Sequence, residues 1–205
     1  MKALILNCTL KGADETSNTA ALLQEAVRIL EEEDVETETI RPSEYQIAHG
    51  VTPDAGDGDQ WPEIYKKVKD ANILIIGTPI WLGEKSSIAT QVIERLYGAS
   101  SETNEKGQSI YYNKVGAAVV TGNEDGGKHA AASIVYSLAH MGFTIPPNPD
   151  SYWVGDAGPG PSYIEADGEK NDYTMQTIKF LSHNLVHFAR MLEKHPIPAE
   201  GNTLE

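Results

Sequence analysis

The sequence predicts an α/β fold, a doubly wound, five-stranded parallel sheet with helices on both faces. Two observations lead to this prediction. Short apolar runs alternate with segments whose apolar residues recur every three or four positions, and this alternation is repeated about five times along the chain. The sequence also contains no internal repeat and no interior linker between two cores. Consecutive strands are then expected to be parallel, because each connecting helix crosses over the sheet.

The expected elements follow from these patterns. The expected strands are residues 2–7, 35–40, 73–76, 114–121 and a proline-interrupted edge strand at 144–149 and 151–155. The expected helices are one with apolar residues between 23 and 30, one at 61–70, one with apolar residues at 88, 92 and 96, one at 130–141 and one at 172–194. In the strand order 2-1-3-4-5, the carboxyl ends of the first, third and fourth strands meet where the order reverses.

The third strand is the expected centre of the sheet. Its unbroken apolar run, 73–76, suits a strand buried on both faces. We expect this strand to stop at Gly77 and Pro79, since both residues interrupt regular structure. Residues 78–83 would then lie at the carboxyl edge of the sheet, where open parallel sheets bind ligands, and Ser86 or Ser87 would cap the next helix. The same stretch also fits an ordinary strand–loop–helix with a packed tryptophan.

A polar loop, residues 8–19 (the first loop), follows the first strand. It leads into a helix whose free N–H groups and dipole favour an anion. The side chains that add hydrogen bonds or charge there are Thr9, Lys11, Ser17, Asn18 and Thr19. In the alternative interpretation, Ser17 or Asn18 merely caps the helix. Neither GxxxxGKS, GxxxxGKT nor GxGxxG occurs, so a nucleoside triphosphate or a first-turn dinucleotide site is not favoured.

A second turn, residues 121–129 (the glycine turn), follows the fourth strand. Its glycines let the backbone approach a ligand closely. The predicted strand order brings this turn, the first loop and residues 78–83 to one crevice. An anion site, an apolar wall and a close backbone together suit a ligand with a phosphate tail and a large flat ring.

Composition excludes several classes of protein. The 205 residues are 40% hydrophobic and 22% charged, which predicts a globular chain with a sizeable core. Lys and Arg number 16 against 30 Asp and Glu, and the formal net charge of -14 argues against nucleic acid and anionic membranes as partners. No apolar run approaches the ~20 residues of a membrane span, and the apolar part of residues 1–7 is too short for a secretory signal. We therefore expect a cytoplasmic protein.

Cysteine and histidine give no metal or disulfide signal. The single cysteine, Cys8, excludes an intramolecular disulfide and a cysteine-held cluster. His183 and His187 lie four residues apart without a third ligand at matching spacing, so we interpret them as surface or interface residues and expect no metal. Residues 1–194 are expected to form one domain, and 195–205 a flexible tail.

On these residues the chain resembles, over most of its length, the flavodoxin-like NAD(P)H-dependent flavin reductase and quinone reductase family. The first loop is similar to the family's FMN-phosphate loop, and residues 78–83 and the glycine turn are similar to the loops that contact the isoalloxazine ring. The branch of the tryptophan-repressor-binding protein resembles it most, through the glycine pair, residues 138–142 and the Gly/Pro-rich run at 158–163. The resemblance implies a flavodoxin-like fold and an FMN site formed by Thr9, Lys11, Ser17, Asn18, Thr19, Thr78, Pro79, Ile80, Trp81, Leu82, Gly83, Thr121, Gly122, Asn123, Glu124, Gly126, Gly127 and Tyr163.

The sequence departs from that branch in two places. Asp125 stands where the branch often has a histidine before the glycine pair. The branch's proline–tyrosine–glycine is replaced by Pro161-Ser162-Tyr163-Ile164. Related iron–sulfur proteins need a cysteine cluster, which this sequence lacks.

The resemblance implies an oxidoreductase that passes hydride from NADH or NADPH through bound FMN to a quinone, free flavin or similar small acceptor. The flavin would carry the chemistry, so we name no catalytic acid or base; His129 is the only titratable side chain nearby, and a surface histidine at a helix start is the other interpretation. Family members often form homodimers or homotetramers.

Two alternatives stay open. The acidic charge also fits a flavodoxin-type electron carrier that does not oxidise NAD(P)H directly, whereas the extra loops at 98–113 and 156–172 (the late loop) favour a reductase because they could build a nicotinamide pocket. A binding module that has lost FMN is the third hypothesis.

Overall fold

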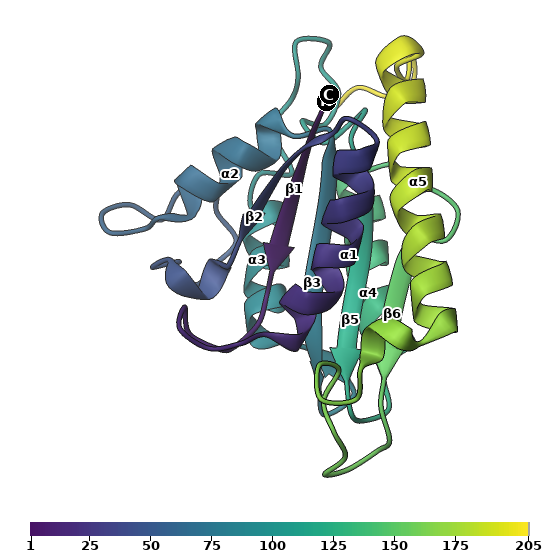
Figure 1. Ribbon diagram of the computed structural model, residues 1–205. Helices are drawn as coiled ribbons and strands as arrows, with labels where there is room; N and C mark the ends of the chain where they lie inside the picture. The colour runs from purple at the N-terminus through teal and green to yellow at the C-terminus, as the bar shows by residue number, and fades with distance from the viewer. Residues whose placement is uncertain (205) are drawn as a thin grey trace.

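The structure, a computed structural model, describes residues 1–204 and has three layers, with a twisted sheet between two layers of helices (Figure 1). The strands are β1 (Lys2–Asn7), β2 (Glu36–Ile40), β3 (Ile73–Trp81), β4 (Glu84–Lys85), β5 (Val115–Gly122) and β6 (Asp150–Val154). The helices are α1 (Asn18–Glu32), α2 (Trp61–Asp70), α3 (Ser87–Tyr97), α4 (Gly127–Met141) and α5 (Asp172–Lys194). The short 3-10 helices are η1 (Pro42–Glu44) and η2 (Gly168–Lys170).

The sheet has the predicted topology. Its parallel strands pair in the order β2-β1-β3-β5-β6, and β4 adds a short antiparallel pairing with the end of β3. Counted without β4, this order is 2-1-3-4-5. The prediction of a doubly wound α/β fold is therefore confirmed, with one short strand more than expected.

Each face of the sheet has its own core. Successive side chains of a strand point to opposite faces, so the apolar runs of β1, β3 and β5 supply both cores. Ala3 and Ile5 pack with α1 and α5, whereas Leu4 and Leu6 pack with α2, α3 and α4. Figure 1 shows α1 and α5 together on one side of the sheet and α3 and α4 behind it.

The third strand is longer than predicted. β3 continues through Gly77 and Pro79 to Trp81, so the expected stop at these two residues was wrong. β1 ends opposite Gly77, and beyond that residue β3 is paired in parallel with β5 alone. A proline is tolerated where one edge of a strand is free. The wall predicted as a loop is therefore the end of a strand.

Two other boundaries differ from the prediction. α4 begins at Gly127 rather than at residue 130, because Gly126 in a left-handed conformation (φ 116°) turns the chain into the helix and accepts the N–H of Ala130 at 2.8 Å. The edge strand is confined to β6, since Thr144 makes only an isolated bridge to Val115. α2 has the predicted bounds, and Ser86 caps α3.

The C-terminal segment after α5 contacts the loop that precedes β5. The side-chain amide of Gln108 donates to the carbonyls of Ile197 and Pro198 at 3.1 Å, and the N–H of Ile197 donates to Asn113 Oδ1 at 2.7 Å. The flexibility of this segment stays a prediction. Within residues 1–204, every helix is too short or too polar to cross a membrane.

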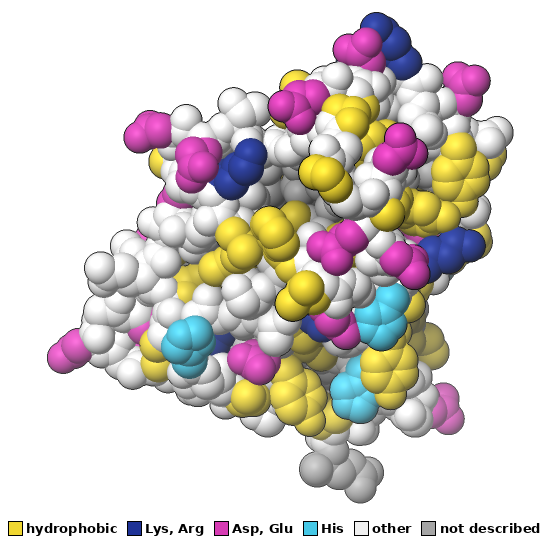
Figure 2. Space-filling model, turned by 90° about the horizontal axis from the view of Figure 1, so that it is seen from below, with side chains coloured by type: hydrophobic (Ala, Val, Ile, Leu, Met, Phe, Trp, Pro, Cys, Tyr) yellow, Lys and Arg dark blue, Asp and Glu magenta, His cyan; other side chains and the backbone are white. Residues whose placement is uncertain are grey.

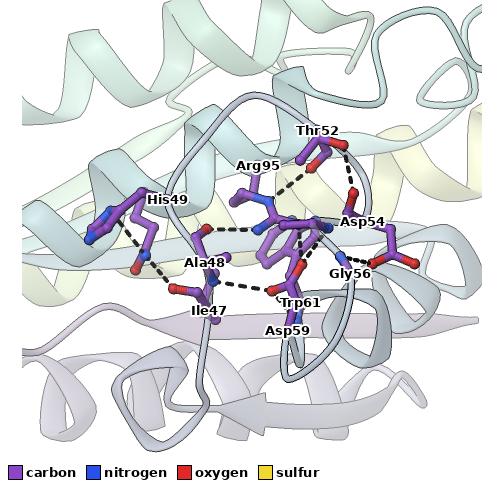
Figure 3. A network of polar contacts seen from close by, with 11 residues as sticks. Ile47, Ala48, His49, Thr52, Asp54, Gly56, Asp59, Trp61 and Arg95 are labelled. Carbon is purple, nitrogen blue, oxygen red and sulfur yellow. Dashed lines mark hydrogen bonds and ion pairs between the residues drawn. The ribbon is translucent and has the colours of Figure 1, made fainter.

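A buried ion pair anchors the long connection between η1 and α2 (Figure 3). Arg95 on α3 is fully buried, and its Nη2 lies 2.6 Å from Oδ2 of Asp59. Its other nitrogens donate to the carbonyls of Ala48 (2.7 Å) and Thr52 (2.8 Å). The Asp59 carboxylate also accepts the N–H of Trp61 at 3.2 Å. Arg95 thus pairs two carbonyls of this connection from within the core, while most of residues 50–58 are exposed.

Candidate functional site

A cleft of about 590 Å³ lies at the carboxyl ends of β1, β3 and β5. Figure 2 looks onto this edge of the molecule, where hydrophobic and acidic side chains surround a hollow. The lining residues are Thr9, Leu10, Lys11, Asn18, Thr19, Pro79, Ile80, Trp81, Thr121, Gly122, Asn123, Glu124, Gly158, Gly160, Ser162, Tyr163 and Glu165. The crevice predicted at the reversal of strand order is therefore present.

The first loop closes one end of the cleft. Ser17 caps α1 by accepting the N–H of Ala20 at 3.1 Å, so the capping role left open for it is confirmed. The next two residues, Asn18 and Thr19, line the cleft from the first turn of α1. Lys11 brings a positive charge to the same end. A helix N-terminus and a lysine at one end of a cleft favour an anionic group there.

Two hydroxyl groups join opposite sides of the cleft floor. Thr19 on α1 and Thr121 on β5 are both buried, and their Oγ1 atoms lie 2.8 Å apart. One of the two hydroxyls donates and the other accepts, which leaves the remaining proton and lone pairs for a ligand. The bond fixes the start of α1 relative to the end of β5.

The end of β3 forms an apolar wall. Pro79, Ile80 and Trp81 line the cleft, and the Trp81 side chain is 54% exposed. The chain then turns back at Leu82, which has a left-handed φ of 53° and donates its N–H to Glu124 Oε1 at 3.1 Å. An exposed indole on a fixed strand offers a flat surface to a ring.

The glycine turn supplies the side of the cleft opposite the first loop. Gly122 lines the cleft, and a Cβ there would come within 2.8 Å of the Ile80 side chain. Gly126 packs against the backbone of Gly83, so the turn supports the hairpin behind the wall. Asn123 donates through Nδ2 to the carbonyl of Gly160 at 2.8 Å, and so attaches the late loop to the turn.

The late loop covers the remaining side. Tyr163 is buried, packs edge-on against Trp153 with ring centroids 5.6 Å apart, and lines the cleft. Burial raises the pKa of Tyr163 to about 12, and its hydroxyl has no hydrogen-bond partner within the described chain. The N–H of Ile164 donates to Asn18 Oδ1 at 3.0 Å, so the late loop is attached to α1 as well.

Most predicted site residues are brought together, and some are not. Six of the predicted residues do not line the cleft: Ser17, Thr78, Leu82, Gly83, Gly126 and Gly127. Thr78 is buried and accepts the N–H of Ser86 at 2.9 Å, so its hydroxyl serves the fold. The glycines support the hairpin and the start of α4.

The prediction missed five lining residues. These are Leu10, Gly158, Gly160, Ser162 and Glu165. Four of them lie in the late loop, for which the signals in the sequence were its unusual length and the Gly/Pro-rich run at 158–163. The carboxylate of Glu165 accepts the N–H of Ser162 at 2.9 Å and its hydroxyl at 2.8 Å, and these bonds hold the pKa of Glu165 below its usual range. A negative charge therefore stands at the rim of the cleft at neutral pH.

The nearby titratable residues have structural roles. His129 pairs with Glu84, Nε2 to Oε1 at 2.6 Å, on the outer side of the β4 hairpin, and does not line the cleft. Cys8 is fully buried, and burial raises the pKa of its thiol far above the neutral range. Neither group is placed to exchange protons with a ligand in the cleft.

The cleft fits FMN in size and in chemistry. Its volume lies within the range of about 300–1,000 Å³ that ligand pockets occupy. One end offers Lys11 and a helix start for a phosphate, and the middle offers Trp81 and a close backbone for a flat ring. Fold and cleft together define a flavodoxin-like flavoprotein.

Comparison with known proteins gives the family. The profile of the family described as NADPH-dependent FMN reductase matches residues 1–157. The chain belongs to this family, whose members are oxidoreductases that use FMN and take electrons from NADPH.

Two relatives align with nearly the whole chain. A divalent metal cation transporter MntH of Mycobacterium bovis is 46% identical over 198 residues, which cover 94% of this chain. The chain spans only 29% of the transporter's length. An 8-demethyl-8-aminoriboflavin-5'-phosphate synthase of Streptomyces davaonensis is 37% identical over 205 residues, covering 96% of this chain and 80% of the synthase.

Solved structures agree with this assignment. A crystal structure of RosB with the bound intermediate 8-demethyl-8-formylriboflavin-5'-phosphate superposes with a TM-score of 0.90 at 37% identity, over 96% of this chain and 82% of that one. An archaeal flavodoxin superposes with a TM-score of 0.59 at 14% identity, over 93% of this chain and 99% of that one, and supports the fold alone. The predicted family, the flavodoxin-like fold and the FMN cofactor are confirmed.

Proposed function

We propose that this chain uses the cleft to bind FMN and to pass electrons from NAD(P)H to a small acceptor such as a quinone or a free flavin. The observation that carries the proposal is the meeting of an anion-binding loop, an apolar wall and a glycine turn in one cleft of suitable size. Membership of the FMN reductase family and a cleft volume of about 590 Å³, which suits a small molecule, support it.

In this proposal each part of the cleft has one task. Thr9, Lys11, Asn18 and the start of α1 bind the phosphate. Trp81 would contact the ring, and the backbone N–H groups beyond Gly122 would stabilise negative charge on it. The chemistry that FMN supplies when bound is hydride transfer from NADPH and onward electron transfer to an acceptor.

In this proposal the late loop limits which small molecules can reach the flavin ring. It is fixed at two points, through Asn123 on one side and through Asn18 on the other, and it carries Tyr163 into the cleft. We assign Tyr163 and Trp81 to the boundary of the space in which nicotinamide and acceptor alternate. No residue of the chain is assigned a proton-transfer role.

The first experiment is an absorbance titration of the flavin-free protein with FMN, followed by anaerobic addition of NADPH or NADH. Bound flavin that is bleached within seconds supports the proposal and identifies the donor. Bound flavin that stays oxidised indicates an electron carrier instead, and failure to bind FMN refutes the proposal. Lys11→Met is expected to weaken FMN binding, and Lys106→Met, in the loop before β5 at the other edge of the sheet, serves as the matched control.

A second candidate treats the flavin as a substrate. Its support is the likeness to the synthase and to RosB over nearly the whole chain. In this candidate, the same cleft binds riboflavin 5'-phosphate and the chain alters its ring. Mass spectrometry of the flavin after incubation with the protein decides between the two, since a reductase returns flavin of unchanged mass. The homodimer or homotetramer that the resemblance implies also stays a prediction, which analytical ultracentrifugation tests.

A further inference from the structure

Arg41 lies next to the first loop but outside the cleft. It follows β2 directly and precedes η1, and its side chain is 16% exposed. Nothing in its sequence neighbourhood marks it as functional. Its side chain reaches back 26 to 29 positions along the chain to the first loop.

The guanidinium of Arg41 donates to three backbone carbonyls of the first loop. Nη1 donates to the carbonyl oxygens of Gly12, Glu15 (3.3 Å) and Ala13 (3.5 Å). Nε of the same guanidinium lies 3.5 Å from the Glu44 carboxylate. One cation thus binds three carbonyls that lie within four consecutive residues of the first loop.

Two further donors bind the neighbouring carbonyls. Ser43 Oγ donates to the carbonyl of Lys11 at 3.2 Å, and Lys11 Nζ donates to the carbonyl of Thr16 at 2.7 Å. A carbonyl oxygen carries partial negative charge and would repel a phosphate if it turned toward it. These donors bind the carbonyl oxygens of the first loop. Lys11 and Asn18, toward the two ends of the loop, line the cleft.

We propose that Arg41 is a positioning residue that holds the first loop in its anion-binding conformation. The inference rests on the proposed function and deepens it, because it makes phosphate binding by the first loop depend on Arg41, which itself lies outside the cleft. Its consequence is selectivity for flavin phosphates over riboflavin, which carries no phosphate. Charge-assisted bonds of this kind are stronger than neutral ones, so their loss is expected to make the first loop more mobile.

The test compares two ligands on matched variants. Binding of FMN and of riboflavin to the flavin-free protein is measured by fluorescence titration for the natural chain, Arg41→Met, Arg41→Lys and Arg28→Met. Arg28 is the control because its side chain is 56% exposed on α1 and its ion-pair partners within residues 1–204 are Glu25 and Glu32, on the same helix. Arg41→Met is expected to weaken FMN binding by about 10- to 100-fold and riboflavin binding by less than about threefold. Arg41→Lys, which keeps the charge and part of the donor set, is expected to recover part of the loss.

Three results would overturn the inference. Unchanged FMN affinity in Arg41→Met, an equal loss for both ligands, or an equal effect of Arg28→Met would each show that Arg41 does not act on the phosphate. Hydrogen exchange of the amides at 9–16 in flavin-free protein gives an independent readout, since faster exchange in Arg41→Met supports the positioning role and unchanged exchange contradicts it. If the natural chain bound no flavin, the proposed function would fail, while the exchange experiment would still decide on Arg41.

Discussion

Removal of Arg95 tests how the long connection between η1 and α2 is held. In Arg95→Met, the aliphatic stem is retained while the buried Asp59 carboxylate and the carbonyls of Ala48 and Thr52 lose their donor. The side chain of Asp59 is 1% exposed, so water solvates its carboxylate very little. Breaking a buried pair by removing one partner costs about 3–5 kcal/mol of the free energy of unfolding. We expect a loss of this size in urea unfolding followed by circular dichroism.

The same site predicts a dependence on pH. Burial alone would raise the pKa of Asp59, but the hydrogen bonds from Arg95 and from the backbone N–H groups of Ala55, Ala48 and Trp61 together lower it to about 2. Because the folded pKa lies below the unfolded value near 3.9, this group stabilises the fold above about pH 4 and ceases to do so as the pH falls toward 2. The contribution is about 2–3 kcal/mol, from a shift of about two units. In Asp59→Asn, this part of the acid sensitivity is expected to disappear.

Two outcomes would refute this account of the ion pair. One is an Arg95→Met variant that loses less than about 1 kcal/mol, the value of an ordinary exposed pair. The other is a natural chain and an Asp59→Asn variant whose unfolding free energies change in parallel between pH 4 and 2. Arg28→Met again serves as the control for removal of an arginine, and no change in unfolding is expected for it.

Three further predictions concern the cleft and its supports. Asn123→Ala removes the donor to Gly160, so we expect FMN to dissociate several-fold faster in stopped-flow displacement, and an unchanged rate would contradict the role of the late loop. Gly126→Ala places a Cβ against the backbone of Gly83 at a residue with a left-handed φ. We expect it to lower the unfolding free energy by more than about 1 kcal/mol in denaturant titration. No loss would mean that the β3–β4 hairpin can shift to make room for the methyl group. Tyr163→Phe deletes a buried hydroxyl that has no partner within residues 1–204, so we expect thermal stability to be unchanged or slightly higher; a loss above about 1 kcal/mol would reveal a hidden hydrogen bond.

Local patterns were sufficient for most of the fold. The apolar run of β3 and the stripe of α5 are properties of neighbouring residues, and both elements were predicted. The end of β3 depends on where β1 stops, which is a property of another strand, so the prediction failed at Gly77 and Pro79. The start of α4 was missed because Gly126 and its left-handed φ, rather than helix propensity, determine it.

Some residues of the site could likewise be predicted from local patterns, whereas others depend on distant parts of the chain. Thr9 and Lys11 lie just after β1 and Trp81 is the last residue of β3, so strand order alone predicted that they meet. The late loop contributes Ser162 and Glu165 only because distant amides attach it to the cleft, and no local pattern encodes those bonds. Arg41 and Arg95 were unpredictable for the same reason, since the backbone carbonyls that they bind lie 26 to 47 positions away in the sequence.

The distribution of the three tryptophans makes the cleft observable without any label. Trp61 is fully buried and Trp153 is 6% exposed, whereas Trp81 is 54% exposed on the wall of the cleft. Water-exposed indole emits at longer wavelength than buried indole, so the red edge of the intrinsic fluorescence comes from Trp81. A ligand that stacks on the wall quenches this edge first, and the blue part of the spectrum follows unfolding of the core. One emission spectrum therefore separates occupancy of the cleft from loss of structure.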